Sequence, residues 1–252
     1  SERMSSPSTP HLVDALARLA QRRPVARKLI ISPTFGGGRE LLRRLSLEGV
    51  GWIGFEVTTL RPLATRLARQ EIERAGLRTI DGFEQQALLD EALDEALLLE
   101  GRGLGELGEG VGFRERVHGA VIALRLSGIG PNNLEAARLG DWSKKLFLLR
   151  VLQRYERLLT QRRRADAATV LTGALAALES EGTKMPVTLG ADEVVLIPGL
   201  STRGLLGRLL AALQARGAKV LETDPVVGLE IPDSVLWNRH SEGSAAPYLF
   251  AP

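Results

Sequence analysis

Cysteine is absent from the 252 residues of this sequence. Disulfide bonds, zinc sites built on cysteine and thiol nucleophiles are therefore excluded. A chain of this length buries roughly three quarters of its unfolded surface, in one large domain or two interleaved ones, so it needs no covalent cross-links. We expect an intracellular protein of the globular class.

Long apolar runs are also missing. No uninterrupted stretch approaches the roughly 20 apolar residues that cross a bilayer, and the N-terminus has neither the basic nor the apolar segment of a secretory signal. We therefore expect a soluble, cytoplasmic protein without a membrane partner. Ser1, Glu2 and Arg3 precede Met4 like the remnant of a tag, and we expect residues 1–10 to be disordered.

The residues of common catalytic sites are sparse as well. The three histidines, His11, His118 and His240, are scattered without the spacing of metal ligands. No G-x-S-x-G nucleophile elbow occurs, and no set of serine, histidine and aspartate is evident. The sequence therefore predicts no metal site and no catalytic residue.

What the chain does have is arginine, in strong excess over lysine, with a net charge of +3 and an isoelectric point near 9.6. The planar guanidinium group presents a fork of donors that suits phosphate, so arginine clusters favour an anionic partner such as nucleic acid. Solvated helix faces account for the same clusters equally well.

Hydrophobic periodicity predicts an α/β fold. Aliphatic runs predict strands at residues 28–32, 52–58, 193–197 and 218–222. Apolar residues three and four apart predict helices at residues 12–20, from 38 onward, 60–75, 83–99, 111–126, 141–161, 166–179 and 203–215. Because strands and helices alternate at both ends of the chain, we expect a parallel sheet.

The predicted strands bracket roughly a hundred residues without a convincing strand, which is the pattern of a helical subdomain inserted into an α/β domain. We expect a sheet domain made of residues 11–80 and 186–252, with an all-helical subdomain at 81–185. The glycine-rich interval 101–112 is typical of a flexible connector. Apolar residues at 247–250 indicate that the sequence is truncated within a longer protein.

A glycine run follows the first predicted strand. Gly36, Gly37 and Gly38 stand where a strand-to-helix turn can bring backbone N–H groups to a phosphate. A working P-loop also needs a lysine and then a serine or threonine, but an arginine and a glutamate follow here. The strand at 193–197 leads into proline and glycine rather than a carboxylate that holds magnesium. We therefore expect the remnant of a nucleotide loop, with no ATPase activity and no cofactor.

Two other interpretations of the glycine run stay open. In a dinucleotide-binding fingerprint Gly36 and Gly38 would be the first two glycines, Leu41 would occupy the third position, and Glu56 would bind the ribose. The chain would then be a nucleotide-binding enzyme. Alternatively, the glycines only form a tight turn between a strand and a helix.

Four stretches of the sequence carry a resemblance to a known family. Residues 28–34 and 38–45 are similar to an opening strand and helix of the form LVPs…gReLlrrL. Residues 57–64 look like a V-x-T-F-x-x-L-A motif whose phenylalanine is leucine here. Residues 149–171 are similar to a superfamily 1 helicase stretch, and residues 194–199 to a degenerate Walker B strand. The chain thus resembles the N-terminal, inactivated helicase-like region of AddB/RecB-type proteins, which carry a PD-(D/E)XK nuclease domain further on.

The resemblance implies a RecA-like, P-loop-NTPase-like 1A domain with an inserted helical 1B domain. The opening strand would take the place of helicase motif Ia, with the ATP loop eroded. The resemblance also implies a part in DNA repair and recombination, within an exonuclease that has an AddA-like helicase subunit as a partner. We expect a non-catalytic domain that binds DNA ends or single strands, and a protein-interaction scaffold for the helicase partner is the alternative.

The resemblance and the charge pattern together indicate seven DNA-binding residues. Thr59 matches the position that contacts the strand backbone in active helicases, although it also suits the N-cap of the following helix. The others are arginines near the ends of predicted helices: Arg39, Arg43, Arg44, Arg162, Arg163 and Arg164. For the last three, the simpler explanation is a helix C-terminus, where the dipole favours cations.

Overall fold

The computed structural model describes residues 9–100, 111–137, 142–180, 182 and 184–221. It is a mixed α/β structure, mostly helical, with a small parallel sheet. The strands are β1 (Lys28–Ile31), β2 (Phe55–Thr58), β3 (Arg78–Thr79), β4 (Arg164–Ala165), β5 (Glu193–Leu196) and β6 (Lys219–Val220). The helices are α1 (Thr9–Arg22), α2 (Phe35–Leu47), α3 (Leu60–Arg74), α4 (Gly82–Glu100), α6 (Val111–Leu126), α7 (Pro131–Ala136), α8 (Trp142–Gln161), α9 (Ala167–Ser180), the 3-10 turn η1 (Val187–Leu189) and α10 (Gly204–Ala215).

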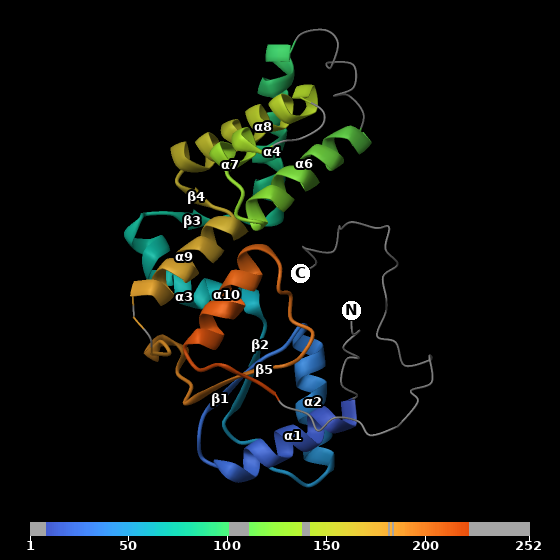
Figure 1. The fold of residues 1–252 in the computed structure, drawn as a ribbon, viewed down its shortest axis with the longest axis vertical. Helices are drawn as coiled ribbons and strands as arrows, with labels where there is room; N and C mark the ends of the chain where they lie inside the picture. The colour runs from blue at the N-terminus through green and yellow to red at the C-terminus, as the bar shows by residue number, and fades with distance from the viewer. Residues whose placement is uncertain (1–8, 101–110, 138–141, 181, 183, 222–252) are drawn as a thin grey trace.

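The main sheet has four parallel strands in the order β2-β1-β5-β6 (Figure 1). At the carboxyl end of the central strand β1, Ile31 pairs with Thr58 of β2 and with Leu196 of β5. Every residue of β1 is buried, as expected for a parallel strand covered on both faces. The chain runs from β1 to β2 on one side and returns to β5 on the other, so the carboxyl ends of β1 and β5 flank a topological switch point. Ligands of open α/β sheets bind outside the strand ends at such a point.

Helices cover both faces of this sheet. On one face α1 and α2 pack against the strands, with Leu16 and Leu45 in the same core as Ile30. On the other face α3, α9 and α10 form a larger core that includes Leu29 and Leu196. Because successive side chains of a strand point to opposite faces, the aliphatic run at β1 supplies both cores.

A third hydrophobic core, the helical core, lies among α4, α6, α7 and α8, in the upper part of Figure 1. Its fully buried residues include Leu93, Val121 and Leu152. The short parallel ladder of β3 and β4 joins the points where the chain leaves α3 and returns to α9. Helix α9 itself packs along α3 in the larger core of the sheet, called the sheet core below, so the segment 81–185 contributes to the sheet core and to the helical core.

The predicted elements are found close to their expected positions, with a few differences. Residues 52–54 form a turn ahead of β2 instead of continuing the strand, and Gly54 has a φ of +84° there. The short elements β3, β4 and α7 were not expected from the sequence. Residues 9 and 10, which we expected to be disordered, begin α1. Most of the connector predicted at 101–112, the segment 1–8 and everything after Leu221 lie outside the described residues.

Candidate nucleic-acid interface

The glycine run begins helix α2 rather than forming a loop. Thr34 is the N-cap residue, and its hydroxyl accepts a hydrogen bond of 3.1 Å from the N–H of Gly37. All three glycines are therefore helical, and the expectation of a glycine turn is corrected. Threonine is a good N-cap, so the helix starts one residue before the first glycine. The N–H groups of Phe35 and Gly36 belong to the first turn, where a helix leaves its donors free of intrahelical partners.

Gly38 has a packing role that Gly36 does not share. A Cβ atom at Gly38 would lie 2.4 Å from Cγ1 of Val57 and 3.0 Å from Cβ of Ser32, whereas nothing lies within 4 Å of a Cβ at Gly36. The third glycine thus lets the start of α2 approach the carboxyl ends of β1 and β2. The first glycine faces open space.

Phe35 and Arg39 lie together at this N-terminus. Phe35 is 54% exposed, a large aromatic ring left in solvent at the strand-to-helix junction. The guanidinium carbon of Arg39 lies 5.9 Å from the centre of that ring, within the range of a cation–π contact. Among the described residues Arg39 has no ion pair. The helix start therefore carries an exposed ring, an uncompensated cation and free N–H donors side by side.

Thr59 lies at the same edge of the sheet. It follows β2 directly, and β2 is in parallel register with β1, so the residues after the two strands are neighbours. Thr59 occupies the N-cap position of α3, but its side chain makes no capping hydrogen bond. The hydroxyl of Thr58 donates instead to the carbonyl of Thr59 at 3.4 Å. Of the predicted residues, the three glycines, Arg39 and Thr59 are thus brought to one edge.

Arg43 and Arg44 lie further along α2 and share one acid. Arg43 donates to both oxygens of Glu40 at 2.7 and 2.8 Å, and Arg44 donates to one of them at 3.0 Å. These hydrogen bonds lower the pKa of Glu40 to about 2, with those from Arg43 contributing most. Arg43 and Arg44 were predicted to bind DNA, but Glu40 already compensates part of their positive charge.

The arginines at residues 162–164 lie elsewhere, where the chain passes from α8 of the helical core to α9 of the sheet core. We call this region the joint. Arg162 donates to both carboxylate oxygens of Glu91 at 2.7 Å. Arg164 pairs with Glu84 and donates to the carbonyl of Arg162 at 2.8 Å. Arg163 stands between them, with no ion pair in the described part of the chain. The predicted site is therefore divided between the sheet edge and the joint.

The acidic residues near β5 form hydrogen bonds and an ion pair at the amino ends of the strands, opposite the edge that carries Phe35. The carboxylate of Asp192 accepts the N–H of Arg27 at 2.8 Å, and Glu193 pairs with Arg23 at 2.7 Å. These contacts fix the linker between α1 and β1. Glu56, the acid considered for a ribose, is paired with Arg66 of α3.

A buried polar cluster at the joint was not predicted. Arg125 of α6 donates to both oxygens of Asp166 at 2.9 and 3.1 Å, and it also binds Glu156 of α8 and Thr169 of α9. Asp166 is 2% exposed. Burial alone would raise the pKa of Asp166, but the hydrogen bonds and charge of Arg125, with those from Thr169, outweigh it and lower the pKa. The cluster ties three helices together.

Phe35 was also missed as a candidate, although one signal was present in the sequence. Phe35 stands in the connection between the strand predicted at 28–32 and the following helix, and such connections usually run over the surface.

No helix among the described residues is long and apolar enough to cross a membrane. No family model matches the chain, and a search of curated proteins finds no match.

Proposed function

We propose that this chain is a non-catalytic, helicase-like domain of a DNA-repair nuclease of the AddB type, which binds single-stranded DNA or DNA ends. One observation carries the proposal: an exposed aromatic ring and an unpaired arginine stand beside a helix N-terminus at the carboxyl edge of a parallel sheet. This is the edge at which open α/β sheets bind their ligands.

The chemistry of the edge suits a single strand. The face of Phe35 can stack on an unpaired base, an interaction worth about 1–3 kcal/mol per base and tolerant of sequence. Arg39 provides a positive charge for a backbone phosphate, and the first-turn N–H groups of α2 provide hydrogen-bond donors at the positive end of the helix dipole. The hydroxyl of Thr59 adds a donor from the neighbouring strand end. A base stacked inside a duplex offers no free face, so the proposal commits to unpaired nucleotides.

We further propose that the sheet and its covering helices are a RecA-like 1A domain. The helices α4, α6, α7 and α8 would then be the inserted 1B domain. Two observations support this assignment. The four helices have a hydrophobic core of their own. In addition β1, whose sequence is similar to motif Ia, pairs with β5, whose sequence is similar to a Walker B strand. An AddA-like helicase subunit would be the protein partner.

Binding without ATP turnover follows from the residues at the same edge. Phosphoryl transfer relies on a cation at the β/γ-phosphates and a carboxylate that holds magnesium. Here β5 is followed by Ile197, Pro198 and Gly199, and the acids of that strand lie at its amino end, in contact with α1 and its linker. The domain would therefore position DNA and leave translocation to its partner.

The test is a titration of fluorescein-labelled oligo(dT) with the wild-type protein and Phe35→Ala. Loss of the stacking ring is expected to weaken binding roughly 5- to 150-fold, from about 1–3 kcal/mol of stacking. Phe83→Ala is the matched control, because Phe83 is 85% exposed on the surface of α4, away from the sheet edge. The control is expected to bind like the wild type.

A second variant separates charge from stacking. Arg39→Ala should reduce the salt dependence of binding by roughly one phosphate contact, about 0.7 in the log–log slope for a single strand. Arg43→Ala combined with Arg44→Ala should have a smaller effect, because Glu40 already compensates these arginines. Undetectable binding of the wild type at low salt, or equal affinities for Phe35→Ala and Phe83→Ala, would refute the proposal.

A further inference from the structure

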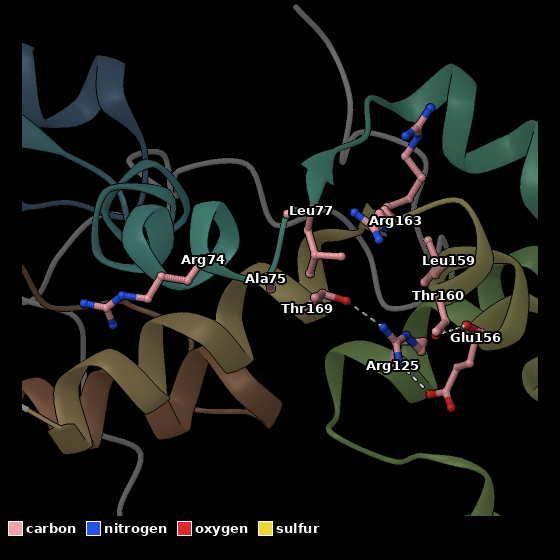
Figure 2. A pocket seen from close by; sticks show the side chains of 11 residues that line it. Arg74, Ala75, Leu77, Arg125, Glu156, Leu159, Thr160, Arg163 and Thr169 are labelled. Carbon is pink, nitrogen blue, oxygen red and sulfur yellow. Dashed lines mark hydrogen bonds and ion pairs between the residues drawn. The ribbon is translucent and has the colours of Figure 1, made fainter.

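A pocket of about 570 Å³ opens at the joint between the sheet core and the helical core (Figure 2). Its lining comes from the end of α3, from α6, α8, β4 and α9. Four of the lining side chains are arginines, Arg74, Arg125, Arg163 and Arg164, against the single carboxylate of Glu156. The lining thus has an excess of positive charge.

Three of these arginines already have acidic partners. Arg125 binds Asp166 and Glu156. Arg164 pairs with Glu84, and Arg74 with Glu71. Figure 2 shows Arg74 directed away from Arg163, on the far side of Leu77. Within the described ranges Arg163 has neither an ion pair nor a side-chain hydrogen bond, so it is the uncompensated cation of this pocket.

Arg163 also has an unusual backbone. Its φ of +52° is the one positive value at a non-glycine position among the described residues. The residue follows α8 closely, where a left-handed residue often ends a helix and is usually glycine. Its N–H donates to the carbonyl of Thr160 at 3.2 Å, and its carbonyl accepts from the N–H of Arg78 at 3.0 Å. The backbone is therefore fixed on both sides in a conformation that arginine adopts at a cost in free energy.

This cost has no compensation in the contacts of the side chain. Strained residues that persist in a well-ordered frame are concentrated at ligand sites. The guanidinium of Arg163 reaches over Gly76, with Nη1 3.6 Å from the position of a Cβ there. The backbone of Arg163 is thus fixed at the wall of the pocket, and its guanidinium donors have no partner among the described residues.

We propose that this pocket binds a phosphate group through Arg163. Guanidinium donors match phosphate oxygens in a fork geometry. A volume of about 570 Å³ lies within the range of small-ligand pockets, so it accommodates a phosphate with its sugar attached. The phosphate belongs either to a DNA strand or to a free mononucleotide. The site shares no residue with the Phe35 edge and extends the proposed function by a second, separate contact.

The experiment is isothermal titration of the wild type and Arg163→Gly with three probes: inorganic phosphate, dAMP, and oligo(dT) carrying a 5′-phosphate. Glycine suits the left-handed backbone, so Arg163→Gly should melt at or above the wild-type temperature. The same variant should bind the phosphate probes at least 10-fold more weakly. Arg163→Lys keeps the cation and should retain part of the binding.

Arg69→Ala is the control, because it removes an arginine that is 78% exposed on the same helix as Arg74 without touching the pocket. It should bind every probe like the wild type. Binding of dAMP that is weakened in Arg163→Gly points to a free nucleotide, and binding of the oligonucleotide alone that is weakened in Arg163→Gly points to DNA. Equal binding by Arg163→Gly and the wild type, or no binding of any probe, would overturn the pocket proposal. Phe35→Ala in the same titration shows separately whether the sheet edge binds the oligonucleotide.

Discussion

Two glycines at the start of α2, two residues apart, differ in what surrounds them, and this difference can be measured. Gly38→Ala would place a methyl group 2.4 Å from Val57. Either the helix or the strand must then move, and overpacking of this kind costs about 1–3 kcal/mol of unfolding free energy. Urea denaturation of Gly38→Ala beside the wild type gives the value.

Gly36→Ala is the control at the same helix end. Its new methyl group meets nothing within 4 Å, and alanine is the better helix former by up to about 1 kcal/mol. We expect an unfolding free energy equal to the wild type or slightly higher. If both variants were equally stable, the start of α2 would not be in close contact with the sheet.

The candidate site could be predicted from the sequence only in part. The glycine run and the family resemblance predicted that Gly36, Arg39 and Thr59 lie near the ends of strands, and parallel strands bring such residues to one edge of the sheet. The pairing of Arg43 with Glu40 follows from a spacing of three on one helix. The pairing of Arg162 with Glu91 spans 71 residues, so no local pattern reports it. Which arginines stay free depends on such distant partners.

At the scale of elements, periodicity predicted the main helices and strands because each buries one face or both faces against a core. The two-residue strands β3 and β4 and the six-residue helix α7 are too short to show a hydrophobic period. The pattern of α9 showed an apolar face, but not that this face would pack on α3 instead of on α8. Periodicity specifies a buried face and leaves the partner to the tertiary structure.

The contact of α9 with the sheet core gives a prediction for that element. Ala174 is fully buried in the core that α9 shares with α3. Ala174→Leu is expected to lower the unfolding free energy by about 1–3 kcal/mol, since extra methylenes have no space in a packed core. Ala176→Leu, two residues on and exposed, should stay within about 0.5 kcal/mol of the wild type. Equal effects in thermal or urea melts would mean that α9 buries a different face.

For the whole molecule, the cluster around Arg125 determines how the two cores are held together. Arg125 belongs to α6 of the helical core, and Asp166 immediately precedes α9 of the sheet core. Both charges are largely out of water, and removing one partner of such a pair leaves the other uncompensated. The joint therefore depends on both residues being charged.

This dependence predicts a response of the whole molecule to pH. The pKa of Asp166 is lower in the folded protein than in the unfolded chain, where it is about 3.9. The pair thus contributes fully at neutral pH, and its contribution is lost as the pH falls below about 4, at up to about 1.4 kcal/mol per pH unit. Asp166→Asn should lower the unfolding free energy at pH 7 by about 3 kcal/mol and flatten its decline in acid.

Urea denaturation at pH 7, 4 and 3 measures both effects. Asp94→Asn serves as the control, because Asp94 pairs with Arg114 while 55% of its side chain is exposed, and exposed pairs contribute at most about 1 kcal/mol. The control should keep the wild-type acid decline, since the buried carboxylate remains. A loss below about 1 kcal/mol in Asp166→Asn, with an unchanged acid decline, would mean that apolar packing and not this ion pair holds the two cores together.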